Sequence, residues 1–314
     1  MSDQTSTETG ILTGNMAPPS GLNRIDAVFS RLRLEGRKGL IAYVTAGDPG
    51  YEATADLVLA MERAGADLIE LGVPFSDPMA DGPVIQQASM RALAGGTTPA
   101  GILGLVRRLR RQTQAPLLLM TYYNPVLHYG LAAFAADASA AGVDGLIVPD
   151  LPVEESGPLL SELQPHRVHL IPFAAPTSTT ERLALIDRAG SDATLNVSAA
   201  NPIGSEPGGF GGSSTTRGFV YCVSLTGVTG AREGLPPGIQ EFMQRVRACT
   251  GRPLAIGFGI ASPAQAALMS KLGDAVIVGS AIVSLVERYA ADREMMLQQV
   301  SALVGSLKQA ISPS

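Results

Sequence analysis

The sequence contains few of the residues that form disulfides or bind transition metals. Its 314 residues include two cysteines and three histidines. Cys222 and Cys249 form no C-x-x-C pair, which favours buried, reduced thiols over a disulfide or a metal site. His166 and His169 lie three residues apart without a cluster of acids or cysteines beside them, and His128 stands alone. A disulfide scaffold and a His/Cys metal centre are therefore disfavoured.

Long apolar runs and early basic residues are also missing. No stretch reaches the roughly 18 apolar residues of a membrane-spanning helix. Residues 1–20 are polar, include Asp3 and Glu8, and precede the first basic residue, Arg24, so they match neither a secretory signal nor a transit peptide. The net charge of -5 and the pI of about 5.3 imply no broad basic surface for nucleic acid or anionic membranes. We expect residues 1–20 to be a flexible tail of a cytoplasmic protein.

The sequence does contain a regular alternation of short apolar runs and helical patterns. The runs are continuously apolar, as expected for parallel strands covered on both faces. They are residues 40–45, 67–71, 116–122, 145–150, 169–174, 219–224, 253–259 and 275–280. Eight β–α units predict an α/β fold, a (β/α)₈ TIM barrel. The alternative, an open doubly wound sheet, would favour G-x-G-x-x-G after its first strand, whereas the sequence there is VTAGDPG.

Helix signals fill the segments between these runs. Four apolar residues on one face predict an extra N-terminal helix before the first strand: Ile25, Val28, Phe29 and Leu32. Capping-box patterns predict helix starts at Ser178 and Ser262, each followed three residues later by Glu or Gln. We expect residues 21–314 to form a single catalytic barrel domain.

One segment, residues 198–218, does not fit the alternation. It is rich in Gly, Ser, Pro and Thr and cannot bury a core. Because it connects the fifth helix to the sixth strand, it should leave the N-terminal face of the barrel, away from the catalytic end. Its glycine spacing matches no phosphate-binding loop, so a flexible insertion is predicted.

Two acids stand out in the stretch LIELGVPFSDPMADGPVIQ, residues 68–86. Glu70 lies within an apolar strand, on the same face as Leu68. If that face is the barrel interior, burial raises the pKa of the Glu70 carboxyl and suits it to proton transfer near pH 7. Asp81 follows in a proline-rich loop that also contains Asp77. The structural alternatives are a core glutamate paired with Lys or Arg and a turn-capping aspartate.

Glycine-rich turns follow the last three strands, where barrels commonly bind phosphate. Backbone N–H groups there, with one hydroxyl, could hold a dianion without a basic side chain: Gly230, Gly259, Gly279 and Ser280. The alternative is that these glycines only permit tight turns. Aromatic residues near the strand ends could line a flat pocket or simply fill the core: Tyr43, Tyr122, Tyr221 and Phe258.

The motif ELGVPFSDPMADGPVIQ resembles the signature of the tryptophan synthase α subunit family. The resemblance covers nearly the whole chain from about Leu22 and includes YVTAGDP, VPDLPVEES, APTST, VSLTGVTGAR and GFGIASP. It implies a (β/α)₈ barrel that cleaves indole-3-glycerol phosphate into indole and glyceraldehyde 3-phosphate. It also implies a β-subunit partner in an α₂β₂ heterotetramer, which receives indole through a tunnel and makes tryptophan. It implies no metal or organic cofactor here, because the pyridoxal phosphate of the family belongs to the β subunit.

The resemblance further implies roles for individual residues. Glu70 would be the general acid–base that protonates indole C3 and helps deprotonate the glycerol hydroxyl. Asp81 would stabilise positive charge at the indole N–H, and Tyr221 would lie beside Glu70. The walls of the indole site would be Tyr43, Met120 and Phe258. The phosphate would be bound by Gly230, Gly259, Gly279 and Ser280.

Two lids and a partner surface are implied as well. Asp77 and Thr229 would link the lids, which are residues 74–82 and 226–232. Contacts with the β subunit would come from Asn124, Pro125 and Pro152. The chain departs from the family pattern in the length of the insertion at 198–218 and at Leu225, where some relatives carry Arg.

Three other functions remain as alternatives to this α subunit. They are a non-catalytic α-like protein that activates a β subunit, a stand-alone indole-3-glycerol phosphate lyase and a phosphate-binding isomerase barrel. The loop PFSDPMADG disfavours the last of these.

Overall fold

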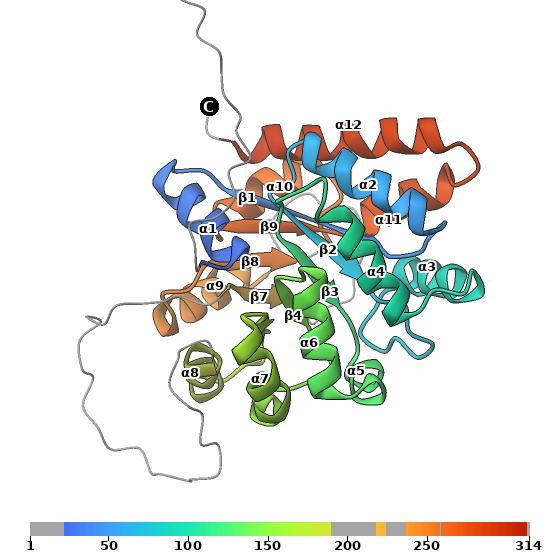
Figure 1. Ribbon diagram of the computed structural model, residues 1–314. Helices are drawn as coiled ribbons and strands as arrows, with labels where there is room; N and C mark the ends of the chain where they lie inside the picture. The colour runs from blue at the N-terminus through green and yellow to red at the C-terminus, as the bar shows by residue number, and fades with distance from the viewer. Residues whose placement is uncertain (1–21, 190–217, 224–236, 258, 313–314) are drawn as a thin grey trace, which may run out of the picture.

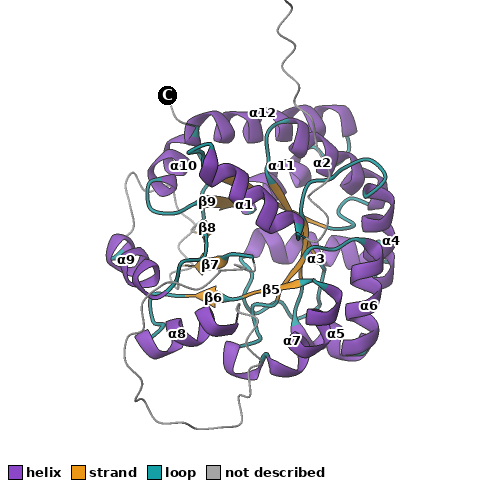
Figure 2. Ribbon diagram, turned by 60° about the vertical axis from the view of Figure 1, so that its left-hand side comes forward, coloured by secondary structure: helices purple, strands orange, loops and turns teal. Residues whose placement is uncertain are grey.

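The computed structural model describes residues 22–189, 218–223, 237–257 and 259–312. A ring of parallel strands occupies the centre, and helices surround it (Figures 1 and 2). The strands are β1 (Gly39–Thr45), β2 (Leu68–Gly72), β3 (Leu117–Met120), β4 (Gly145–Ile147), β5 (His169–Ile171), β6 (Phe173–Ala174), β7 (Val220–Val223), β8 (Leu254–Gly257) and β9 (Ala275–Val278). Their order in the sheet is β5-β4-β3-β2-β1-β9-β8-β7-β6.

The ring closes at the fifth strand, which Pro172 divides into β5 and β6. β5 pairs with β4, and β6 pairs with β7. Proline has no N–H to donate to a ladder, but the Pro172 carbonyl accepts from the Tyr221 N–H at 2.9 Å. Eight strand positions therefore form the predicted (β/α)₈ barrel, and the sequential strand order excludes the doubly wound alternative.

The helices of the described residues form the outer layer, except α1 (Arg24–Leu34), which covers one end of the barrel. The other helices are α2 (Tyr51–Arg63), α3 (Pro83–Ala94), α4 (Pro99–Leu109), α5 (Tyr123–Tyr129), α6 (Leu131–Ala141), α7 (Gly157–Leu163), α8 (Thr180–Ala189), α9 (Ile239–Cys249), α10 (Pro263–Ser270), α11 (Ser280–Arg288) and α12 (Arg293–Ile311), with 3₁₀ turns η1 (Val153–Glu155) and η2 (Gln164–His166). None of the helices in these ranges is long and apolar enough to cross a membrane.

The predicted extra helix is α1, which packs against the interior of the barrel at one end (Figure 2). Its buried residues Ile25, Phe29 and Leu32 share a cluster with inward-facing strand residues. The Phe29 ring lies 5.5 Å from the ring of Phe219, just before β7. This contact seals the N-terminal end, so the opposite end of the barrel is left for chemistry.

Aspartates stabilise the N-terminal face of the barrel. Asp67, Asp144 and Asp274 each precede a strand, and each accepts an N–H at the start of a neighbouring strand at 2.8 Å. Each also pairs with a basic side chain, as Asp67 does with Lys308 at 2.6 Å. These acids therefore serve strand register and stability, in contrast to the acids described below.

The two capping predictions have different outcomes. The Ser262 side chain accepts from the Gln265 N–H, as predicted. The start predicted at Ser178 is wrong, because α8 begins at Thr180 and the Thr179 hydroxyl accepts from the Arg182 N–H at 3.3 Å. The Ser178 hydroxyl instead accepts from the Ala175 N–H in the preceding turn.

The predicted tail, residues 1–20, lies outside the described residues. The insertion at 198–218 does too, except for Gly218. The Gly218 N–H donates to Asp26 of α1 at 2.7 Å, so the chain enters β7 at the N-terminal face.

Candidate active site

Glu70 lies in the middle of β2 and points into the barrel. Its neighbours in register are Tyr43 on β1 and Leu118 on β3. Leu68 belongs to the interior cluster, whereas Ile69 packs against the surrounding helices. The alternation of the strand therefore puts the Glu70 carboxyl on the inner face.

The carboxyl of Glu70 is fully buried, and among the described residues neither of its oxygens has a hydrogen-bond partner. Burial raises its pKa to about 8. A core glutamate paired with Lys or Arg therefore finds no support in this part of the chain. The group is protonated at neutral pH and can act as an acid first and a base afterwards.

Tyrosine rings surround Glu70. Tyr43 and Tyr221 are buried, and Glu70 lies within electrostatic range of both phenols. Burial is the main cause that raises the pKa of each phenol, so both stay protonated. Glycines give the rings room, because a Cβ at Gly72 would lie 2.0 Å from the Tyr43 Oη, and one at Gly257 would lie 2.8 Å from the Tyr221 ring. Met120, opposite Gly72 on β3, is half-buried against the same interior residues.

Asp81 lies in the loop between β2 and α3, and three contacts hold that loop. The Ala80 N–H donates to the Tyr122 Oη at 2.9 Å, and the Gln86 amide donates to the Asp81 carbonyl at 2.9 Å. The Phe75 ring stacks on Tyr122 with centroids 5.2 Å apart. The loop is thereby fastened at both ends.

Partial burial raises the pKa of the Asp81 carboxyl to about 6, and a hydrogen bond from the Tyr122 hydroxyl opposes that rise. Asp81 is therefore mostly ionised at pH 7, whereas Glu70 is mostly protonated. Both carboxyls lie within electrostatic range of the Tyr43 and Tyr221 phenols. Because their pKa values fall on opposite sides of neutrality, one can serve as counter-charge and the other as proton donor.

The glycine-rich ends of β8 and β9 lie side by side, because these strands are neighbours. Gly259 has a φ of 64°, which favours glycine. Gly279 directly precedes α11, whose first residue is Ser280, and a Cβ at Gly279 would lie 3.4 Å from the Tyr43 ring. Tyr43 therefore connects the Glu70 side of the barrel with the N-terminus of α11, where backbone N–H groups favour anions.

Three of the predicted site residues lie outside the described residues: Thr229, Gly230 and Phe258. Leu225 and the rest of the predicted lid at 226–232 lie there too.

Asp77, predicted to link the lids, and Asn124, predicted to contact a partner, are both exposed. The Asp77 carboxylate accepts from the Ser76 hydroxyl at 2.5 Å. Asn124, at the start of α5, lines a largely apolar groove of about 360 Å³ together with Phe75. Pro152 lines a second hollow, described next.

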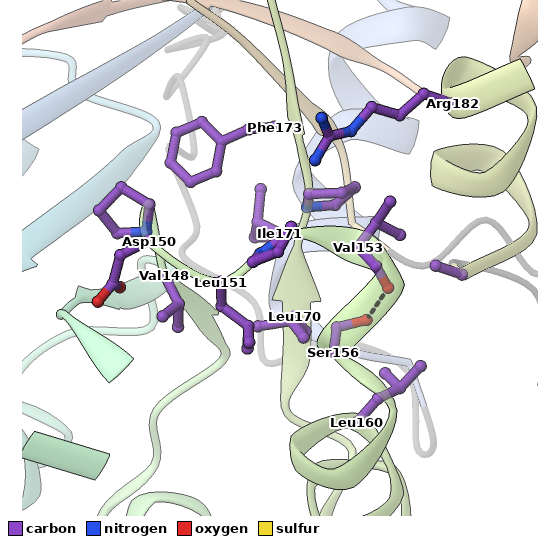
Figure 3. A pocket seen from close by; sticks show the side chains of 14 residues that line it. Val148, Asp150, Leu151, Val153, Ser156, Leu160, Leu170, Ile171, Phe173 and Arg182 are labelled. Carbon is purple, nitrogen blue, oxygen red and sulfur yellow. Dashed lines mark hydrogen bonds between the residues drawn. The ribbon is translucent and has the colours of Figure 1, made fainter. Parts of the chain in front are cut away.

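A cavity of about 180 Å³ lies between the end of β4, the break between β5 and β6, and helices α7 and α8 (Figure 3). Phe173 lines it, and the Phe173 ring lies 4.9 Å from the ring of Tyr221. Arg182 lines it from α8 and pairs with Glu154 at 3.1 Å. The cavity therefore adjoins the aromatic wall of the site without containing either acid.

Sequence reasoning missed several supports of the site. Tyr122 was expected only as a pocket wall or core residue, yet its hydroxyl contacts both Ala80 and Asp81. The amide of Gln86, which also reaches the Pro78 carbonyl at 3.4 Å, was not singled out. The sequence signal that could have identified it is its position, one turn inside the helix that follows the acidic loop.

Among the described residues, no group of three or more His, Cys, Asp or Glu could hold a metal ion. His169 instead pairs with Asp26 at 2.7 Å, at the end of the barrel that α1 covers. The polar groups gathered at the open end are carboxyls, phenols and backbone amides, which suit proton transfer and anion binding.

A family model described as tryptophan synthase alpha chain matches residues 29–206 and 213–312. The chain is 43% identical over 290 residues to the tryptophan synthase alpha chain of Thermoanaerobacter sp. (strain X514), covering 92% of this chain and 100% of that relative. It is 49% identical over 263 residues to that of Acidiphilium cryptum (strain JF-5), covering 83% and 86%. The crystal structure of tryptophan synthase subunit alpha from Legionella pneumophila str. Paris superposes with a TM-score of 0.78 at 36% identity, covering 93% of this chain and 99% of that one. The unmatched residues, 207–212, fall within the segment interpreted as an insertion.

Proposed function

Because the chain belongs to the tryptophan synthase alpha chain family, we propose that Glu70 and Asp81 together perform its reaction, the cleavage of indole-3-glycerol phosphate to indole and glyceraldehyde 3-phosphate. The chain is accordingly a carbon–carbon lyase of tryptophan biosynthesis. One observation carries the assignment of these two residues. Glu70 is a fully buried carboxyl with a pKa of about 8, and the Asp81 carboxyl, whose pKa is about 6, lies within electrostatic range of the same two phenols, Tyr43 and Tyr221.

The proposed reaction is a proton relay through Glu70. The protonated carboxyl gives its proton to indole C3, and the ring becomes positively charged at its nitrogen. Asp81, ionised, stabilises that charge. The Glu70 carboxylate then takes the proton of the glycerol hydroxyl next to the ring, the carbon–carbon bond breaks, and its electron pair returns to the ring. An aldehyde and neutral indole result, and Glu70 is protonated again.

The rest of the substrate is proposed to span the mouth of the barrel. Tyr43, Met120 and Phe258 would enclose the indole ring, and Tyr221 would lie beside Glu70. The phosphate would be bound by Gly230, Gly259, Gly279 and Ser280. Among the described residues, the position of Tyr43 supports this arrangement of the substrate. Tyr43 lies opposite Glu70 in the strand register and next to Gly279, which precedes α11. The relay uses side chains and backbone amides only, so we propose that this chain needs no metal or organic cofactor.

The proposed partner is a tryptophan synthase β subunit, in an α₂β₂ assembly, that takes up indole and carries pyridoxal phosphate. The support is the apolar groove lined by Phe75 and Asn124, together with the exposed apolar side chains of Met79, in the same loop as Phe75, and Leu127, in the same helix as Asn124. Asp77 and Thr229 would link the lids, and Asn124 and Pro152 would contact the β subunit. We place the protein in the cytoplasm, which suits its two unpaired cysteines.

Indole release from indole-3-glycerol phosphate, measured with and without a β subunit, tests the assignment. A lyase α subunit should release indole alone and release it faster with the β subunit. A chain that reaches its full rate alone is a stand-alone lyase. A chain that releases no indole in either case, yet stimulates the β subunit, is the non-catalytic alternative and refutes the proposal.

The pH dependence of kcat/KM for indole release should be bell-shaped. Asp81 must be ionised, so activity falls as the pH drops through about 6. Glu70 must begin protonated, so activity falls as the pH rises through about 8. A profile measured from about pH 5 to about pH 9.5 checks both limbs, and a rate that keeps rising above about pH 9 contradicts the acid role of Glu70.

A further inference from the structure

We propose that Tyr122 is the positioning residue of the reaction, because its side chain fastens the acidic loop to the barrel and aims the Asp81 carboxylate. The inference rests on the proposed role of Asp81 and names the residue of the barrel that positions its carboxylate. Tyr122 follows β3 as the residue before α5, so it belongs to the rigid frame rather than to the loop.

Three contacts of Tyr122 carry the proposal. Its ring stacks on Phe75 near the start of the loop, with an interplanar angle of 29°. Its hydroxyl accepts the Ala80 N–H at 2.9 Å near the end of the loop. The same hydroxyl lies close enough to the Asp81 carboxylate to lower its pKa. A single side chain, 6% exposed, thus joins both ends of the loop and the charged group it presents.

The hydrogen bond from Ala80 leaves the phenol O–H available to Asp81. The Tyr122 oxygen accepts from the peptide N–H of Ala80, the residue before Asp81, so its own O–H can point towards the Asp81 carboxylate. The proton is well held, since burial and the nearby Asp81 charge both raise the pKa of Tyr122. Tyr122 therefore remains a neutral donor across the working pH range, and a hydrogen bond to the charged form favours an ionised Asp81.

The other titratable groups near Asp81 act differently. Tyr43 on β1 and Tyr221 on β7 lie within electrostatic range of its carboxylate, and burial raises the pKa of both phenols, which keeps them neutral. Glu70 on β2 faces the same two phenols and is protonated at neutral pH. Among the described groups, Tyr122 is the hydrogen-bond donor that acts on Asp81.

Tyr122→Phe tests the proposal, because it removes the hydroxyl and keeps the ring that stacks on Phe75. We expect kcat for indole release at pH 7 to fall about tenfold, with a smaller change in KM, since a hydrogen bond to a charged group is lost. The acidic limb of the pH profile should move upward by about one pH unit, because the donor that favours ionised Asp81 is gone. Tyr123→Phe is the matched control, since it removes the neighbouring hydroxyl and keeps the Tyr123 N–H bond to Asp150 at 2.9 Å.

The double variant Tyr122→Phe/Asp81→Asn separates the inference from the function on which it rests. If Tyr122 acts through Asp81, the Phe substitution should change kcat by less than about twofold when Asp81→Asn is already present. An unmoved acidic limb, or a tenfold loss that persists in the Asp81→Asn background, overturns the role of Tyr122 and leaves that of Asp81 intact. A mild effect of Asp81→Asn alone overturns the proposed function itself.

Discussion

Replacing Glu70 with glutamine is expected to abolish indole release, with kcat reduced by roughly 10³-fold or more. Glutamine keeps the size of the side chain but can neither give a proton to indole C3 nor take one from the glycerol hydroxyl. The proposed phosphate site is built from glycines and Ser280, so binding of glycerol 3-phosphate should stay close to normal. Turnover by steady-state assay and binding by calorimetry measure the two effects separately.

The same substitution should stabilise the protein at neutral pH. Burial raises the pKa of Glu70 to about 8, so the folded chain holds a proton there that the unfolded chain releases above its ordinary pKa. This difference costs folding up to about 3 kcal/mol at pH 7. The cost is absent below the unfolded pKa and grows as the pH rises towards 8, so Glu70→Gln should raise the midpoint of urea unfolding at pH 7 and leave it nearly unchanged at about pH 4.

Two results would contradict this account of Glu70. Undiminished turnover would end the acid–base role. A variant less stable than the native chain at pH 7 would mean that the carboxyl has a stabilising partner outside the described residues. Asp67→Asn is a useful comparison for stability, since the buried Asp67 carboxylate pairs with Lys308 at 2.6 Å and its neutralisation should destabilise the fold.

The barrel could be predicted from the sequence because its strands are covered on both faces and therefore read as continuous apolar runs. The same signal failed to locate strand ends at the catalytic side. The run at 116–122 stays apolar, yet β3 ends at Met120, because the loops that line a barrel mouth are apolar as well. Pro172 was visible in the sequence, but its effect on the fifth strand depends on the pairing of β6 with β7.

The site, too, could be predicted only in part from the sequence. Period-two alternation placed Glu70 on the face of Leu68, and one strand is enough for that inference. The attachment of Asp81 to Tyr122 joins two segments far apart in the chain, and neither spacing nor composition encodes it. The wrong helix start at Ser178 shows that even a local prediction can depend on the neighbouring structure. Both Ser178 and Thr179 are suitable N-cap residues, but the Ser178 hydroxyl is used by the preceding turn, so Thr179 caps the helix.

Asp81→Asn is expected to lower kcat by about 10²-fold or more, as for the loss of a strong electrostatic stabiliser in a partly buried site. Asparagine fits the same space and can still accept from the Tyr122 hydroxyl, so the loop should keep its shape while the negative charge is lost. Asp137→Asn is a suitable control, because Asp137 lies on α6 and contacts the Tyr129 hydroxyl at 2.6 Å, outside the barrel mouth.

The pH profile of Asp81→Asn gives the sharper test. The limb near pH 6 belongs to Asp81, whose pKa is about 6, so it should disappear, while the limb near pH 8, from Glu70, should remain. A turn-capping aspartate would behave otherwise: its replacement would lower stability and leave both limbs in place. A hundredfold loss of kcat with only the basic limb surviving therefore assigns the counter-charge to Asp81, because no change in loop packing removes one ionisation and spares the other.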